Sequence, residues 1–379
     1  MSRWLKIITA ILLVLALMPI LPARAKAAAP CDFYSVQKNG AIYCIEMPVT
    51  GTWNGGLVVF AHGYVPVTAG IDIPWSQMVL SDGTYLPDLV NSMGYAFATT
   101  SYSVNGLAVT QGQRDILNLM EYFKEKVAKP RRAYLVGASE GGLITTLLIE
   151  NHPKVFNGGM AMCAPIGDFK AQINYWGNFR VAFDYYLPGV LPPSAVNIPQ
   201  PLIDNWDTQT APGIGYALSI TDPATIGKLL AVTGAPIDPA DPISSTPATV
   251  LGLLWYNVFA TNNGVDVLHG QPFDNHKFLY MDPALNLAAA RFSADKKALQ
   301  RIKENYQTTG RLKTALVTLH TTGDPIVPYS QVTRYGQKVL ANKKSAAYLN
   351  IPVQRYGHCN FTTSEVLGGF SWLVSQPTK

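Results

Sequence analysis

The amino-acid sequence predicts an α/β protein: a mostly parallel, doubly wound sheet with a large, mainly helical segment inserted into it. Short apolar runs alternate with amphipathic helical stretches in two parts of the chain, 30–167 and 311–379, which is the pattern of strands and crossover helices in such a sheet. The segment between them, 168–310, shows no such alternation and is far longer than the roughly 15 residues beyond which loops are uncommon in compact domains. We therefore expect one core domain made from the two outer parts and a cap (lid) domain made from the middle part.

The first 29 residues differ from the rest of the chain. Arg3 and Lys6 precede an apolar run from Ile7 to Leu21, and alanine-rich sites for cleavage follow. This pattern predicts a secretory signal peptide over residues 1–29 and a secreted or periplasmic product. A retained membrane anchor is the alternative, but the run is shorter than the roughly 20 residues that a spanning helix needs.

Composition narrows the possible partners. The chain has 379 residues, of which 48% are hydrophobic and 14% charged, with a formal charge of +5. Four positive charges and no acid lie in the predicted signal peptide, so the remainder is close to neutral. A nearly neutral chain does not fit a nucleic-acid-binding protein. Beyond the leader, no stretch of the sequence is apolar enough to predict a membrane span.

The first part of the core begins with a predicted hairpin and continues with buried parallel strands. Asn39 and Gly40 tolerate a positive φ and separate two short strand patterns, which predicts the hairpin turn. The run from Leu57 to Ala61 is apolar at every position, as expected of a strand buried on both faces, and it leads into His62-Gly63-Tyr64. The next expected elements are a helix near Tyr85 to Met93, a strand at Tyr95 to Thr99 and an amphipathic helix from Thr110 to about Val127.

The segment from Val136 to Gly142 joins a short strand to a helical pattern. Within it, Gly137 and Gly141 flank Ser139 at the spacing G-x-S-x-G, where the missing Cβ atoms let backbone crowd a sharp turn. Such a nucleophile elbow holds its serine strained and exposed at the carboxyl end of a strand, where open α/β sheets bind ligands. A glycine-rich turn with an incidental serine is the alternative, and the rest of the chain must decide between them.

The sheet pattern stops after a strand at Gly158 to Ala164 and resumes near residue 311. Helical stretches in the intervening cap are expected near 225–232, 249–259 and 294–306. The aromatic residues of this segment can line a pocket or form the cap's own core, and we favour the second use for any one of them. The elements expected after the cap are a strand from Thr314 to His320, a helix from Ser330 to Asn342, a strand from Ala347 to Gln354 and a closing helix from Thr363 to Val374.

Asp324 and His358 each follow one of these last strands, as Ser139 follows an earlier one. A serine hydroxyl is a poor nucleophile until a base takes its proton, and the base needs an acid that fixes its tautomer. With these three residues in the order serine, acid, histidine, the chain resembles the α/β-hydrolase superfamily. The resemblance covers roughly 57–166 and 311–379, and the matching segments are Ala61-His62-Gly63-Tyr64, Gly137 to Gly142, Gly323 to Pro328 and Gly357-His358.

The resemblance implies a role for each of five residues. Ser139 is the implied nucleophile, His358 the general base and acid, and Asp324 the acid behind the histidine. The backbone N–H groups of Tyr64 and Glu140 are the implied oxyanion hole. The implied mechanism runs through an acyl-enzyme on a small or polymeric ester and needs no metal or organic cofactor.

Two residues depart from the pattern of the α/β-hydrolase superfamily. The carboxyl of Glu140 can raise the pKa of the neighbouring histidine, contact a substrate cation or cap the following helix, and we favour the helix cap. Cys359, directly after His358, resembles tannase-like and feruloyl-esterase-like enzymes, in which a disulfide ties a cysteine before the serine to one after the histidine. Here the position before the serine holds Ala138.

The four cysteines of an exported chain favour disulfides, and two bridges allow three connectivities. The preferred pairs are Cys31 with Cys44 and Cys163 with Cys359. The second pair is expected to lie close together, because the strand near its first member neighbours the elbow strand and the histidine loop must reach back to the serine. Buried free cysteines are the alternative, and no spacing supports a zinc site.

We predict an exported serine hydrolase that cleaves carboxylic esters. Alternatives are a serine peptidase or amidase similar to the prolyl-oligopeptidase group, whose larger members carry a propeller domain that this chain is too short to hold, and a non-catalytic binding protein on the same scaffold. Structural or surface roles are expected for the other histidines: His62, His152, His269, His276 and His320. Four other aspartates are less well placed relative to strand ends than Asp324, so we do not expect them to be the acid of the triad: Asp115, Asp168, Asp266 and Asp274.

Overall fold

The structure is a computed structural model that describes residues 31–377. Its described residues form one eight-stranded sheet of order β1-β2-β4-β3-β5-β6-β7-β8. The two pairs that involve β2 are antiparallel and every pair from β4 to β8 is parallel, which confirms the predicted fold class. The strands are β1 (Phe33–Val36), β2 (Ile42–Glu46), β3 (Gly56–Ala61), β4 (Ala96–Thr100), β5 (Arg132–Ala138), β6 (Gly158–Met162), β7 (Ala315–Gly323) and β8 (Tyr348–Tyr356).

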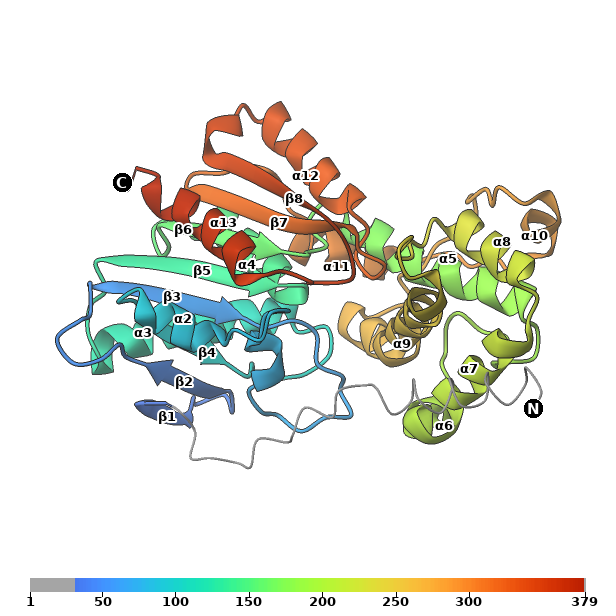
Figure 1. Cartoon of the computed structure of the whole chain (residues 1–379), viewed down its shortest axis with the longest axis horizontal. Coiled ribbons are helices and arrows are strands. Elements are labelled where there is room, and N and C mark those ends of the chain that lie inside the picture. Colours follow the sequence, from blue (N-terminus) through green and yellow to red (C-terminus); the bar gives the residue numbers. More distant parts are fainter. Residues whose placement is uncertain (1–30, 378–379) are drawn as a thin grey trace.

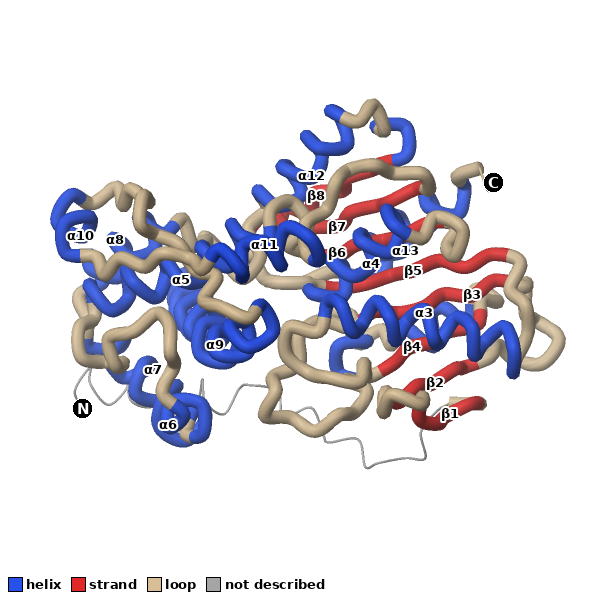
Figure 2. The backbone as a smooth tube through the Cα atoms, turned by 180° about the vertical axis from the view of Figure 1, so that it is seen from behind, coloured by secondary structure: helices blue, strands red, loops and turns tan. Residues whose placement is uncertain are grey.

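Helices cover both faces of the sheet. One face carries α2 (Leu86–Ser92) and α13 (Thr363–Ser375), of which α13 lies in front in Figure 1. The other face carries α3 (Val109–Lys126), α4 (Glu140–Asn151) and α12 (Ser330–Ala341), and α3 lies in front in Figure 2. Two short 3-10 helices, η1 (Trp75–Met78) and η3 (Ser345–Ala347), lie in connections.

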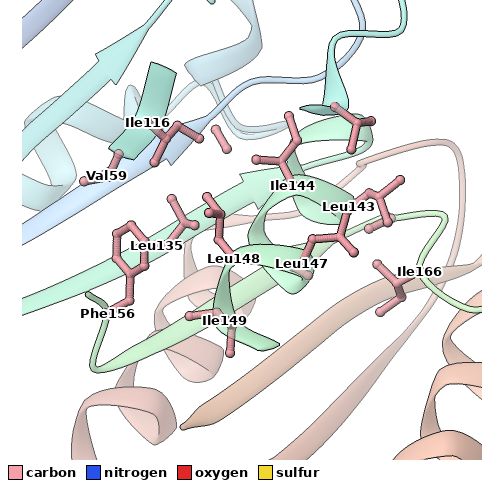
Figure 3. Close-up of a cluster of buried hydrophobic side chains, with 14 of the residues drawn as sticks. Val59, Ile116, Leu135, Leu143, Ile144, Leu147, Leu148, Ile149, Phe156 and Ile166 are labelled. Atoms are coloured by element: carbon pink, nitrogen blue, oxygen red, sulfur yellow. The ribbon is translucent and has the colours of Figure 1, made fainter. Parts of the chain in front are cut away.

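Successive residues of the central strands fill two separate cores. Val58 and Phe60 of β3 pack with α2 and α13, whereas Leu57 and Val59 pack with α3, α4 and α12. Figure 3 shows part of the second core, where side chains of β5 and α4 meet Ile116 of α3. Because each such buried side chain contributes about 1.5–3 kcal/mol, these cores fix the strand ends from which the site loops emerge.

The chain between β6 and β7 is helical, and we call residues 169–305 the helical insertion. All of its helices but the last gather to one side of the sheet (Figure 1) and share a core of their own, into which Ile326 and Val327 of the loop after β7 also pack. Ala298 and Ile302 of the last helix pack instead in the core beside α3 and α4. The insertion contains α5 (Phe169–Tyr186), α6 (Gln200–Asp204), the π-helical turn η2 (Trp206–Thr210), α7 (Ala211–Ile220), α8 (Pro223–Thr233), α9 (Pro242–Leu268), α10 (Pro283–Ala288) and α11 (Lys296–Asn305). The division into a core domain and a cap domain stays a prediction.

The described residues contain two disulfides. Cys31 is bonded to Cys44 and Cys163 to Cys359, the two pairs preferred from the sequence. Across residues 31–377, no helix combines the length and apolarity needed to cross a membrane. The predicted signal peptide lies outside the described residues.

Candidate active site

Ser139 is the single residue between β5 and α4, and its backbone has φ 55° and ψ −121°. A backbone of this kind costs a non-glycine residue on the order of 1–3 kcal/mol. Two glycines make the turn possible, because a Cβ on Gly137 would collide with the carbonyl of Gly141, and a Cβ on Gly141 would collide with the carbonyl of Ala61. The chain therefore forms the strained elbow that the G-x-S-x-G spacing predicts.

Ser139, His358 and Asp324 come together although Ser139 is 219 positions from His358, which is 34 positions from Asp324. Ser139 Oγ lies 3.0 Å from His358 Nε2, and His358 Nδ1 lies 2.7 Å from Asp324 Oδ2. The three follow β5, β8 and β7 in turn, so their side chains meet at the carboxyl edge of the parallel sheet. This arrangement can relay a proton from the serine hydroxyl to the imidazole.

The Asp324 carboxylate is buried and held from several sides. Its Oδ1 accepts hydrogen bonds from the N–H groups of Ile326, at 2.8 Å, and Val327, at 2.9 Å. Buried His320 places Nε2 2.8 Å from Val327 O and 3.4 Å from Asp324 Oδ2. Burial alone raises the pKa of Asp324, but the charge of His358 and the hydrogen bonds from His320 and His358 outweigh it and hold the pKa at about 2. The acid is therefore ionised at neutral pH.

Two backbone donors lie beside the serine. The N–H groups of Tyr64 and Glu140 have no hydrogen-bond acceptor among the described residues. The loop of Tyr64 is fixed by Gln77, whose Oε1 accepts from Gly63 N at 2.6 Å and whose Nε2 donates to Tyr64 O at 3.2 Å. The Tyr64 hydroxyl donates to Phe259 O at 2.9 Å. The two free donors are thus available to an oxygen atom of a ligand.

The Glu140 carboxyl does not cap its own helix, which is a correction to the favoured expectation. Its Oε1 instead accepts a hydrogen bond of 2.7 Å from the N–H of Ala108, the residue before α3. Burial raises the pKa of Glu140 to about 8, although the hydrogen bond from Ala108 opposes this. The carboxyl is therefore mostly protonated at pH 7, because its pKa lies above that pH.

Two cavities reach Ser139. The first, here called the apolar cavity, has a volume of about 80 Å³ and is lined almost wholly by apolar surface of the elbow and the helical insertion. The second, here called the histidine-side cavity, has a volume of about 280 Å³ and includes His358 in its lining. Tyr64, Ser139 and Tyr256 line both, and burial raises the pKa of Tyr256 while the neighbouring Ser139 hydroxyl lowers it. The side chain of Tyr256 thus lies where the two cavities meet.

One face of α9 contacts the loops that carry the site. Thr249 Oγ1 lies 2.8 Å from the hydroxyl of Tyr356, which ends β8. Asn263 Oδ1 accepts from Leu107 N at 2.7 Å, before the start of α3. Between Thr249 and Asn263 along the helix lie Gly252, Tyr256 and Phe259. Gly252 is close to Ile326, in the loop that carries Asp324. Tyr256 lies near Ser139, and Phe259 lies at the loop of Tyr64. Spacings of three and four residues place all five on one side of a helix.

The other candidates named from the sequence lie outside this arrangement. His62 stacks on Tyr102 with ring centroids 3.9 Å apart, and burial lowers its pKa to about 4. Asp168 caps α5, and Asp115 accepts from Ser103. His152 and His269 end α4 and α9, and His276 is exposed. Sequence patterns did not identify His320, Gln77 or Tyr256 as site residues.

The mostly parallel sheet, the elbow and the loops at its carboxyl edge have the arrangement of the α/β-hydrolase fold. Residues 90–176, less than a quarter of the chain, match the model of the prolyl oligopeptidase family (Peptidase_S9). No curated protein sequence matches the chain.

Several solved structures are similar in fold. The acylaminoacyl peptidase of Pyrococcus horikoshii has 12% sequence identity and a TM-score of 0.43, with 86% of this chain and 36% of the peptidase covered. This chain therefore spans about a third of that peptidase. Est1E from Butyrivibrio proteoclasticus has 12% identity and a TM-score of 0.43, covering 91% and 99% of the two chains. An esterase of Pyrococcus furiosus has 12% identity and a TM-score of 0.42, covering 90% and 87%. The fold assignment rests on the topology of the chain itself.

Proposed function

We propose that this chain is an exported serine hydrolase that cleaves carboxylic esters. Ser139 acts as the nucleophile, His358 as general base and acid, and Asp324 as the acid that orients the histidine. The observation that carries the proposal is the continuous series of hydrogen bonds from Ser139 Oγ through His358 to Asp324. Ser139 lies at a strained elbow, beside two backbone N–H groups that have no hydrogen-bond acceptor among the described residues.

The proposed reaction has two matching halves. His358 Nε2 takes the proton of the Ser139 hydroxyl while Oγ bonds to the ester carbonyl carbon, and the carbonyl electron pair moves to its oxygen. The N–H groups of Tyr64 and Glu140 donate to that oxyanion, each contributing about 3–4 kcal/mol. His358 then gives its proton to the departing alcohol oxygen as the C–O bond breaks. A water molecule attacks the acyl-enzyme in the same way and releases the acid, while ionised Asp324 stabilises the imidazolium in both halves.

Export is part of the proposal. Residues 1–29 would be removed as a signal peptide, leaving a secreted or periplasmic enzyme. Both disulfides support this location, because disulfides persist in oxidising compartments and are rare in the cytosol. Sequencing the N-terminus of the protein isolated outside the cytoplasm is the test, and an intact Met1 on the mature protein would contradict cleavage.

A serine peptidase or amidase is the second candidate, favoured by the match of residues 90–176 to the prolyl oligopeptidase family. The same three residues would then cleave an amide and protonate an amine. A panel of p-nitrophenyl acyl esters and peptide anilides separates the two, and we expect kcat/KM for the best ester to exceed that for every anilide. The reverse order would support the peptidase. No turnover and no labelling by a fluorophosphonate probe would support a non-catalytic binding protein.

The triad itself is tested by single alanine variants. Ser139→Ala removes the acyl-enzyme, His358→Ala the proton transfer, and Asp324→Ala the orientation of the imidazole. We expect each to reduce kcat by about 10⁴-fold or more, with losses far from additive in double variants because the three act as a unit. Ester turnover with matched circular dichroism spectra is the measurement. A folded Ser139→Ala variant that keeps near-full activity would refute the mechanism.

A further inference from the structure

The two cavities at Ser139 differ in what they offer to the two halves of an ester. The apolar cavity is walled by side chains such as Phe169, Ile173, Trp176 and Phe273, and none of its lining residues is highly exposed. The histidine-side cavity is more than three times as large and includes exposed Val79. A bound ester must place one half on each side of the serine.

His358 decides which half goes to which side. In the proposed reaction, the imidazole must protonate the oxygen of the departing alcohol, so that oxygen must lie within hydrogen-bond reach of Nε2. Among the described residues, His358 lines the histidine-side cavity and is absent from the lining of the apolar cavity. The alcohol half therefore belongs on the histidine side, which leaves the apolar cavity for the acyl chain.

From this geometry we propose that the apolar cavity is the acyl-binding site and that the enzyme prefers esters of short apolar acids, of about four carbons, with larger alcohols. This inference rests on the proposed esterase function and adds the substrate class. The volume of about 80 Å³ is roughly half that of an engineered cavity of about 150 Å³ that holds benzene. A chain of three or four carbons fills such a space, and longer chains exceed it.

The walls of the apolar cavity are held in place. Trp176 stacks on Tyr256 with ring centroids 4.9 Å apart and planes at 18°, and its indole N–H donates to Ile326 O at 3.0 Å. Phe169 stacks on Tyr306 with centroids 5.0 Å apart. Because these rings are fixed by packing and hydrogen bonds, the cavity cannot widen without breaking contacts. The raised pKa of Glu140 keeps its charge out of the lining at neutral pH.

Turnover of a matrix of esters tests the assignment. One series keeps p-nitrophenol as the alcohol and varies the acid from acetate through butanoate and hexanoate to decanoate. The other keeps butanoate and varies the alcohol from methanol to naphthol. We expect kcat/KM for butanoate to exceed that for acetate by about 10-fold, as burial of two more methylenes allows, and to fall again at decanoate. Across the alcohol series we expect less than about a 3-fold loss as the alcohol grows.

Three variants make the test specific. Ala260→Phe fills the apolar cavity from α9 and is expected to remove the advantage of butanoate while acetate turnover persists. Ile173→Ala enlarges the same cavity and is expected to move the optimum to hexanoate. Val79→Phe on the histidine side is the matched control, expected to change alcohol preference but not acyl preference. Circular dichroism and labelling by a fluorophosphonate show that each variant is folded and reactive.

The outcomes separate this inference from the esterase proposal. An acyl preference that Ala260→Phe and Ile173→Ala leave unchanged, or that Val79→Phe alters instead, would overturn the assignment of the cavities while the esterase stands. A preference of the parent enzyme for decanoate over butanoate would overturn the size argument. Absence of turnover on every ester, together with absence of labelling, would remove the esterase itself.

Discussion

Tyr256 brings a hydroxyl from the helical insertion to the nucleophile. Burial raises its pKa, and the charges of Asp324 and Glu140 raise it further against the hydrogen bond with Ser139. The hydroxyl therefore stays protonated at neutral pH and can donate a hydrogen bond. When Oγ bonds to a substrate, this donor is free to stabilise negative charge on the reacting oxygens.

We expect Tyr256→Phe to reduce kcat by about 10- to 100-fold, the loss of one hydrogen bond to a developing charge. The ring and its stack on Trp176 remain, so KM should change little. Steady-state kinetics on a butanoate ester measure both constants. Tyr216→Phe, in exposed α7, is the matched control. An unchanged kcat would show that the hydroxyl serves packing alone.

Glu140 makes the stability of the fold depend on pH. Its pKa is about 8 in the folded chain, against an ordinary 4.5, so above pH 4.5 the unfolded state loses this proton while the folded state keeps it. The stability contributed by the protonated carboxyl is therefore fully present below pH 4.5 and is lost as pH rises through 8. The effect is on the order of a few kcal/mol, because each pKa unit corresponds to about 1.4 kcal/mol.

Glu140→Gln tests this dependence, since glutamine keeps the acceptor for Ala108 N–H but does not ionise. Between pH 5 and 8, we expect the Tm of the parent to fall more steeply than that of the variant. Glu125→Gln is the matched control, because it makes the same change in an exposed side chain of α3, away from the site. Parallel Tm curves for the parent and Glu140→Gln would contradict the expectation.

Among the single residues of the site, the sequence predicted those that belong to local motifs. Ser139 stands in a glycine pattern, and Asp324 and His358 stand just after strands, so adjacent residues identify them. Tyr256 and His320 carry no such mark. The contact of Tyr256 with the serine depends on how α9 lies across the sheet edge, and His320 occupies an ordinary strand position whose neighbour happens to be the acid.

Among the elements, α5 and α9 hold the site from the side of the insertion. Three side chains of α5 bind the loop that carries Asp324. Tyr175 donates to Pro325 O, and Gln172 and Trp176 both donate to Ile326 O. The sequence predicted part of α9 and none of α5. Both helices are packed on several sides, so their apolar residues do not form the one-sided stripe that identifies a surface helix. Amphipathic α3 and α12, by contrast, were predicted to within a residue or two of their ends.

The disulfide between Cys163 and Cys359 ties the loop after β6 to the loop of His358. It closes a sequence separation of 196 residues, whereas the bond between Cys31 and Cys44 closes 13. In the chain-entropy model the longer loop gives the larger stabilisation, up to about 5 kcal/mol. The bond also restricts the position of the catalytic base that we propose.

We therefore expect the double variant Cys163→Ser, Cys359→Ser to lower both Tm and kcat. Removing the other pair with Cys31→Ser and Cys44→Ser should lower Tm but leave kcat within about 2-fold. Thermal unfolding and ester kinetics on the purified variants give both quantities. Equal effects of the two double variants on kcat would show that the bond near the histidine has no special role in the reaction.

For the whole molecule, the predicted division into core and cap leads to a deletion test. Replacing residues 180–300 with a short linker should leave the sheet folded, because β1 to β8 all lie outside that range. It should also change the substrate preference, since it removes Tyr256 and the carbonyl that holds Tyr64. Circular dichroism and ester kinetics measure the two effects, and exposed apolar surface would favour aggregation. A soluble product without secondary structure would argue against two domains.

The architecture was predictable because alternating strand and helix patterns depend on local sequence. The position of the insertion after β6 followed from the point where the strand pattern stops in the sequence, whereas the order of the strands in the sheet came from the structure. The packing of the insertion against the sheet edge was not predictable, because it depends on contacts between residues hundreds of positions apart. Those contacts form both cavities, so the substrate class that we propose could not be predicted from the sequence.

The order of the site residues along the chain also sets when the molecule can first act. Ser139 precedes His358 by 219 positions. A ribosome adds about 5–20 residues each second, so a nascent chain carries a complete elbow for roughly 10 to 40 s before its base is synthesised. The bond from Cys163 must wait equally long for Cys359. During synthesis the nucleophile that we propose thus remains inert until its base has been added to the chain.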